Sequence, residues 1–207
     1  MGWSTSCILV NERGPGYLGT FPNHDPVAAH ELIGKLGLGP VRTSSLSNFD
    51  AGLSPKAGWF CVGAYPGAAL LAGVPELIGC VENEGNPLLA KLLKVFPRAS
   101  LLAVELASAT NHFAYAYFAR GSLLRALAGD AERGVIVDKG TPQPEETPIL
   151  AMVSNTDVPQ KGETLAFAMS QKFFGSPLDR FPSEKLAVEL VKVIKPVWPF
   201  SLLQRST

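Results

Sequence analysis

The polar residues best suited to do chemistry gather in one stretch, NHFAYAYFARGSLLRALAG, and in the GVIVDKG segment that follows it. They offer an amide, an imidazole, two phenols, a guanidinium and a carboxylate: Asn111, His112, Tyr115, Tyr117, Arg125 and Asp138. These groups could bind a small polar ligand or exchange protons with it, provided that the fold brings them to one pocket. We therefore predict these six as binding residues and name no catalytic residue.

Metal and cofactor chemistry find little support in the chain. His24 and His30 are six residues apart, a spacing that does not align two imidazoles on one helical face. Cys7, Cys61 and Cys80 form no CxxC pair and no metal-ligand spacing. We expect no metal site and no cofactor.

Nucleophilic and phosphate-binding motifs are also missing from the sequence. It contains no GxSxG elbow, and the glycines of GKLGLGP follow a helix instead of opening one. Carboxylates cluster in GDAERGVIVDKG (Asp130, Glu132 and Asp138) and at Glu145 and Glu146, where they could act as an acid and base pair if their environments separated their pKa values. Because they stand in turn-like polar sequence beside basic residues, we interpret them as solvated loops.

Around the candidate residues, alternation predicts a hairpin. In the first strand the large aromatic residues share one face: Phe113, Tyr115 and Tyr117. Ala114 and Ala116 lie on the other face, and Gly121 can take the positive φ of a turn. We expect a helix to pack on the alanine face. The aromatic face is either core, which we prefer, or the wall of a groove.

The remaining elements follow from caps, prolines and apolar runs. Asp25, Pro26 and Gly37 predict the start and end of a helix, and Asn86 with Pro87 predicts the start of another. Two further helices are expected at 162–175 and 183–196. Strands are expected at 5–11, 17–21, 41–49, 99–110 and in the apolar runs of 58–73.

This order of elements predicts an α+β fold, with a mostly antiparallel sheet, helices packed on it and two helices at the C-terminus. We expect a single domain over residues 1–207. Residues 141–160 hold four prolines and are predicted to form a connector to a C-terminal helical subregion.

Composition limits the partners. Lys plus Arg and Asp plus Glu both number 18, so the formal charge is zero and nothing favours nucleic-acid binding. A neutral chain also has little charge repulsion to oppose a homo-oligomer. No stretch approaches the roughly 20 apolar residues of a membrane span. Three cysteines without a signal peptide lead us to expect a cytoplasmic protein.

Four stretches occur in the order GWSTSCILV, FCVGAYPG, HFAYAYFARGSLLRALAG with GVIVDKG, and PSEKLAVEL. Through them the chain resembles an uncharacterised bacterial domain family of unknown function, of actinobacterial type. The residues that fit its third block are Tyr115, Tyr117, Gly121, Arg125, Gly134, Val135, Ile136, Asp138 and Gly140. Asn111 and His112 stand where the family often has Asp-Trp. The resemblance implies no known reaction.

Three hypotheses about function follow. The first is a non-enzymatic module that binds a protein partner, of an immunity-like or regulatory kind. The second is a small-ligand-binding protein or an enzyme, with a cleft beside the hairpin of residues 111–127. The third is a structural homo-oligomer. For the second hypothesis, the candidate side chains must converge on one concave pocket.

Overall fold

A computed structural model describes residues 3–77, 79–82, 85–154 and 157–193. Its strands are β1 Ser4–Asn11, β2 Val41–Asn48, β3 Trp59–Tyr65, β4 Ala68–Ala72, β5 Ser100–Ala107, β6 His112–Ala119, β7 Ser122–Asp130, β8 Gly134–Gly140 and β9 Ala187–Val193. Its α-helices are α1 Pro26–Leu36, α2 Phe49–Leu53, α3 Pro87–Val95, α4 Thr147–Leu150 and α5 Val158–Phe174.

The described strands form one nine-stranded sheet in the order β2-β9-β3-β4-β1-β5-β6-β7-β8. Every pair of neighbours in this order is antiparallel. The predicted α+β class with an antiparallel sheet is therefore confirmed. None of the described helices is long and apolar enough to cross a membrane.

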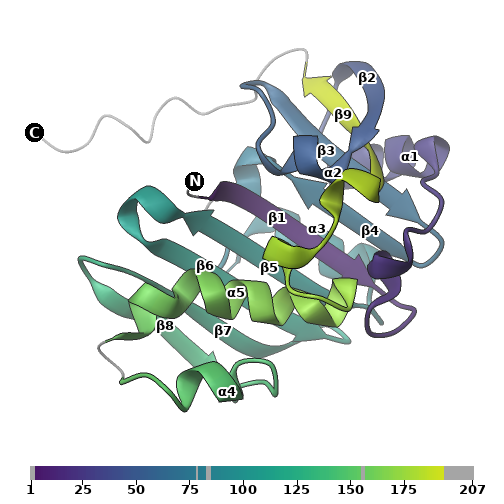
Figure 1. The fold of residues 1–207 in the computed structure, drawn as a ribbon. Coiled ribbons are helices and arrows are strands. Elements are labelled where there is room, and N and C mark those ends of the chain that lie inside the picture. The colour runs from purple at the N-terminus through teal and green to yellow at the C-terminus, as the bar shows by residue number, and fades with distance from the viewer. Residues whose placement is uncertain (1–2, 78, 83–84, 155–156, 194–207) are drawn as a thin grey trace, which may run out of the picture.

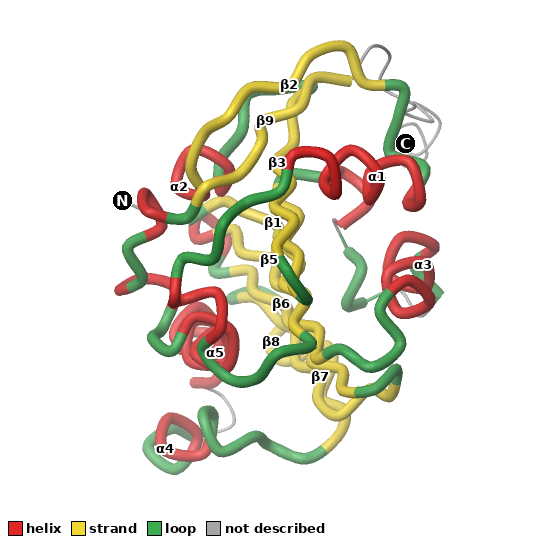
Figure 2. The backbone as a smooth tube through the Cα atoms, turned by 90° about the vertical axis from the view of Figure 1, so that its right-hand side faces the viewer, coloured by secondary structure: helices red, strands yellow, loops and turns green. Residues whose placement is uncertain are grey.

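Helices cover both faces of the sheet. Figure 2 shows α1 and α3 on one side and α2, α4 and α5 on the other. Strands in the middle of the sheet are consequently apolar on both sides. In β1, Cys7 and Leu9 belong to the core beneath α5, whereas Ile8 and Val10 belong to the core beneath α1 and α3. Successive side chains of a strand point to opposite faces, so one short segment contributes to both cores.

The capping residues predicted for α1 are confirmed. The Asp25 carboxylate accepts hydrogen bonds from the backbone N–H groups of Val27 and Ala28, at 2.9 and 3.0 Å. Gly37 ends the helix in the left-handed region, with φ of 73°. Local chemistry alone therefore places both ends of this helix.

Helices lie over both faces of the hairpin: Ala114 and Ala116 belong to the core beneath α1 and α3, and α5, which was not predicted there, lies on the aromatic face. Phe113, Tyr115 and Tyr117 all belong to the core that α5 covers, and Figure 1 shows α5 lying across β6 and β7. Close approach is possible because Gly162 has no side chain: a Cβ there would lie 2.0 Å from Phe113 Cδ1. The aromatic face is therefore core over most of its length.

Two predicted elements are wrong in type. The expected strand at 17–21 is a short 3-10 helix, Tyr17–Thr20, because Gly16 and Phe21 at its ends both have positive φ and turn the chain. Of the two helices expected at the C-terminus, the first is α5, but residues 187–193 of the second form the strand β9. Its valines suit a strand, and its backbone pairs with β2 on one side and β3 on the other. Tertiary pairing thus overrides a local helical pattern.

Candidate functional site

The six predicted binding residues do not meet in one pocket. Tyr115, Arg125 and Asp138 belong to a largely buried network of side chains. His112 and Asn111 lie at one end of β6, and Tyr117 lies near the other. The hypothesis of a single cleft built from all six is therefore wrong.

The network is centred on Glu146, which is completely buried. Its Oε1 accepts hydrogen bonds from the Tyr115 hydroxyl at 2.5 Å and from Arg125 Nε at 2.9 Å, and its Oε2 accepts one from Gln143 N at 2.7 Å. The Arg125 guanidinium also donates to Asp138 and to the Lys139 carbonyl. The interpretation of Glu146 as a solvated loop residue is wrong, because the connector folds back and carries this carboxylate under the sheet.

The protonation states of the network follow from burial and charge. Burial and the adjacent Glu146 carboxylate raise the pKa of the Tyr115 phenol, so it stays protonated and donates. Burial alone would lower the pKa of Arg125, but its hydrogen bonds to Asp138 and Glu146 outweigh this and raise it. The three groups satisfy one another, and we conclude that they attach the connector to the sheet.

A first hollow, of about 410 Å³, lies where β5 ends and β6 begins, and we name it the acidic hollow. It is lined by Glu105, Ala107, Thr110, His112, Asp130, Glu132 and Arg133. His112 Nε2 lies 3.6 Å from Glu105 Oε1, and its Nδ1 lies 3.9 Å from Glu82 Oε1. Asn111 is exposed and has φ of 50°, a left-handed backbone conformation that asparagine tolerates, so we interpret its role as forming the turn before β6.

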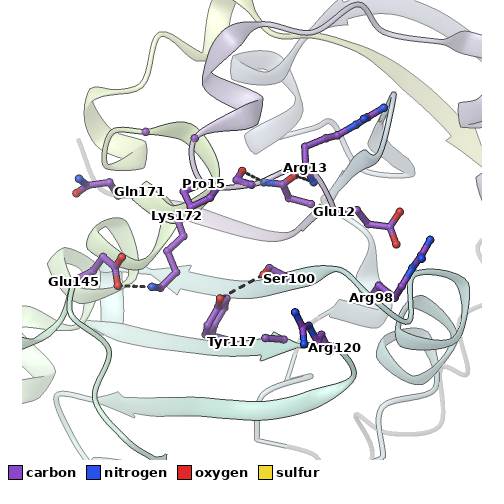
Figure 3. Close-up of a pocket in the computed structure, with 15 residues that line it drawn as sticks. Glu12, Arg13, Pro15, Arg98, Ser100, Tyr117, Arg120, Glu145, Gln171 and Lys172 are labelled. Atoms are coloured by element: carbon purple, nitrogen blue, oxygen red, sulfur yellow. Dashed lines mark hydrogen bonds and ion pairs between the residues drawn. The ribbon is translucent and has the colours of Figure 1, made fainter.

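A second hollow, of about 520 Å³, lies where β1 and β6 end and β5 begins, beside the C-terminal turn of α5 (Figure 3). We name it the basic hollow. It is lined by Asn11, Glu12, Arg13, Gly14, Pro15, Gly16, Arg98, Ser100, Tyr117, Ala119, Arg120, Glu145, Gln171, Lys172 and Gly175. Four of these residues are cationic and two are anionic, so the hollow carries a net positive charge although the whole chain is neutral.

One wall of the basic hollow is the loop after β1, and Asn11 shapes it. The buried Asn11 side chain accepts a hydrogen bond from Arg13 N at 2.8 Å and donates to the Gly14 carbonyl. Gly16 N then donates to the Lys172 carbonyl at 2.9 Å, which joins the loop to α5. The loop is therefore held at both ends, and its shape does not depend on a ligand.

The floor and one end of the basic hollow carry hydroxyls and a paired lysine. The Tyr117 hydroxyl lies 3.4 Å from Ser100 Oγ, within hydrogen-bonding distance across β5 and β6. Lys172 Nζ lies 5.2 Å from the centre of the Tyr117 ring, a cation–π contact. The same ammonium lies 2.7 Å from Glu145 Oε2 and forms an ion pair with it, but the angles of this contact do not meet those of a hydrogen bond.

At the other end of the basic hollow stand Arg98 and Arg120 (Figure 3). Both are exposed, and neither guanidinium has a hydrogen bond or an ion pair within the described part of the chain. Arg120 N donates to the carbonyl of Ala99, the residue that follows Arg98, at 3.1 Å. Arg120 takes φ of 51° in the hairpin turn. The hollow thus has two guanidinium groups without a partner among the residues that the structure describes.

Of the residues that line this hollow, sequence reasoning named Tyr117 as a candidate binding residue and Glu145 as a carboxylate of a solvated loop, and it missed Arg98, Arg120 and Lys172. They come from separate segments, and no spacing pattern connects them before the chain folds. The arrangement supplies donors in a concave site: guanidinium, ammonium and hydroxyl groups suit an anion, above all a phosphate or carboxylate. Among the described residues, no three His, Cys, Asp or Glu side chains are placed to hold a metal ion.

Comparison with known proteins gives a match to a family model. No curated protein and no solved structure matches the chain. Residues 5–176 match a family of unknown function, which confirms the resemblance to an uncharacterised domain family; its bacterial character stays a prediction. Because the match spans most of the sequence, the chain belongs to the family of unknown function DUF6928.

Proposed function

We propose that the protein binds a small anionic molecule, bearing phosphate or carboxylate groups, in the basic hollow. The observation that carries this proposal is the pair Arg98 and Arg120, which line the hollow and whose guanidinium groups have no partner among the described residues. Arginine forms paired hydrogen bonds with planar or tetrahedral oxyanions, and such charge-assisted bonds are among the strongest in proteins.

The size and lining of the basic hollow support the same conclusion. Its volume of about 520 Å³ lies within the range usual for small-molecule sites. Tyr117 and Ser100 add hydroxyls to its floor, and these can donate to ligand oxygens. The loop that Asn11 holds is already ordered by its own hydrogen bonds, so binding of a ligand would cost little conformational entropy there.

Nothing in the hollow supports assignment of a reaction. We therefore propose a binding or regulatory role and not an enzymatic one. The three cysteines are unpaired and buried, which is compatible with the cytoplasmic location that we propose for the protein.

Isothermal titration calorimetry with inorganic phosphate, tripolyphosphate and citrate tests the proposal. We expect at least one of the three to bind, with an affinity that falls as salt rises. Arg98→Ala and Arg120→Ala should each weaken binding by about fivefold or more, since each removes a charge-assisted hydrogen bond.

Arg180→Ala is the matched control, because Arg180 is 80% exposed and is not among the residues lining the hollow. It removes the same charge and should change affinity less than twofold. The proposal is refuted if none of the three anions binds at low salt. Equal losses in all three arginine variants would also refute it, because the effect would then be one of net charge.

A second candidate function, protein interaction, is favoured by the outer edge of β8. This strand is last in the sheet and pairs only with β7 in the described structure. Large apolar residues are exposed around it: Leu123, Leu124, Val135 and Ile136. Because the chain is neutral, a second copy that pairs edge to edge through β8 is the partner we propose.

Light scattering across a concentration series tests this second candidate. We expect the wild type to dimerise and Ile136→Lys to be monomeric, since a lysine on an edge opposes strand pairing. A wild type that stays monomeric at every concentration would rule out the β8 dimer, whatever the outcome for anions.

A further inference from the structure

The basic hollow already contains an anionic group of the protein itself. Glu145 lines it, and its Oε2 is buried, accepts no hydrogen bond and lies 2.7 Å from Lys172 Nζ. We propose that Glu145 is an intrachain competitor for the Lys172 end of the hollow, and that a ligand with a second anionic group binds there by displacing it. This inference rests on the proposed function.

The contact between Glu145 and Lys172 is weak enough to exchange. The two side chains remain 21% and 18% exposed, although Glu145 Oε2 itself is buried and accepts no hydrogen bond. Solvent-exposed ion pairs stabilise proteins by about 0–1 kcal/mol, and this pair, which is more buried but lacks a hydrogen bond, is expected near the upper end of that range. Lys172 also keeps its contact with the Tyr117 ring when Glu145 leaves, so the ammonium stays in place for an incoming anion.

Release of Glu145 does not require the connector to detach. The next residue, Glu146, is completely buried and is held by Tyr115, Arg125 and Gln143. A rotation of the Glu145 side chain is therefore sufficient, while the backbone stays anchored beside it. Figure 3 shows Glu145 and Lys172 together at one end of the hollow, with Arg98 and Arg120 at the other.

This arrangement separates two classes of anion. A ligand with one anionic group can bind at Arg98 and Arg120 and leave the Glu145–Lys172 pair intact. A longer ligand with several anionic groups reaches Lys172 only when Glu145 moves away. Glu145 therefore lowers the affinity for extended polyanions and leaves that for single anions nearly unchanged.

Calorimetry of Glu145→Gln with inorganic phosphate and tripolyphosphate tests the inference. Tripolyphosphate should bind about three- to fivefold more tightly to Glu145→Gln than to the wild type, as expected when a partly exposed ion pair no longer competes. The affinity for phosphate should change less than twofold. Glu184→Gln, which removes an exposed carboxylate outside the hollow, should change neither affinity by twofold.

Lys172→Met provides a second variant if Glu145→Gln alters folding. It should weaken tripolyphosphate binding, and Glu145→Gln should then give no gain in the Lys172→Met background, because the two effects share one contact. If tripolyphosphate binds the wild type but Glu145→Gln gives no gain, the inference is overturned and the proposed function stands. A gain of the same size for phosphate also overturns it. If neither probe binds any variant, the inference is overturned, and the proposed function is overturned with it when citrate also fails to bind.

Discussion

The buried network around Glu146 makes a quantitative prediction about stability. Glu146→Gln keeps the shape of the side chain but removes the negative charge that faces Arg125, whose side chain is 2% exposed. The Arg125 guanidinium would keep only Asp138, which is 61% exposed, as a charged partner. The substitution therefore leaves a buried positive charge only partly compensated.

The expected loss can be stated from the properties of buried ion pairs. Removing one member of such a pair costs about 3–5 kcal/mol of unfolding free energy. Because Asp138 still contacts Arg125 and the amide can still accept a hydrogen bond, we expect the lower end, about 3 kcal/mol. For a chain of this size that is a fall in Tm of roughly 6–12 °C.

Urea and thermal unfolding of Glu146→Gln and of Glu145→Gln compare the unfolding free energy that is lost when each of these two adjacent carboxylates is removed. Glu145 is partly exposed and has one ion contact, so its loss should cost no more than about 1 kcal/mol. The double variant Arg125→Met with Glu146→Leu should be more stable than Glu146→Gln, since it removes both charges. Our reasoning is refuted if Glu146→Gln unfolds within 1 kcal/mol of the wild type, or if both neighbours cost the same.

Three further predictions concern other parts of the molecule. Gly162→Ala should lower the unfolding free energy by about 1–3 kcal/mol in urea titrations, because the new methyl group would overlap the Phe113 ring. Gly34→Ala is the control: its methyl group would meet no atom within 4 Å, so it should not destabilise the fold. Burial lowers the pKa of His24 more than the nearby Glu189 and Asp25 carboxylates raise it, so the unfolded chain takes up a proton at a higher pH than the folded protein does. The contribution of His24 to the unfolding free energy should be complete above about pH 6.5 and should fall as the pH drops below that value. His24→Gln should reduce this dependence of the unfolding free energy on pH. Burial raises the pKa of the Cys7 and Cys80 thiols to about 12 and that of the Cys61 thiol further. A thiol reagent at pH 8 should therefore label none of the three until the protein is unfolded. Labelling of the native protein at the rate of a free thiol would contradict their burial.

Elements that depend on local chemistry were predictable from residues close together in the chain. Asp25, Pro26 and Gly37 place α1, because a cap acts within one helical turn. The hairpin of β6 and β7 follows from alternation and a glycine turn. Strand β9 could not be predicted, because its pairing with β2 and β3 overrides the helical spacing of its leucines and valines.

The candidate site divides in the same way. The sequence by itself determined the hairpin, its aromatic face and the presence of Tyr117, Tyr115 and Arg125 within it, since a strand has a period of two residues. Only the tertiary structure decided that Glu146 neutralises Arg125 and closes that part of the hairpin to ligands. It also decided that Arg98, Arg120 and Lys172 share one hollow. The physical reason is that charges interact through space: their effect depends on which segments the sheet brings together, and that order is absent from local sequence.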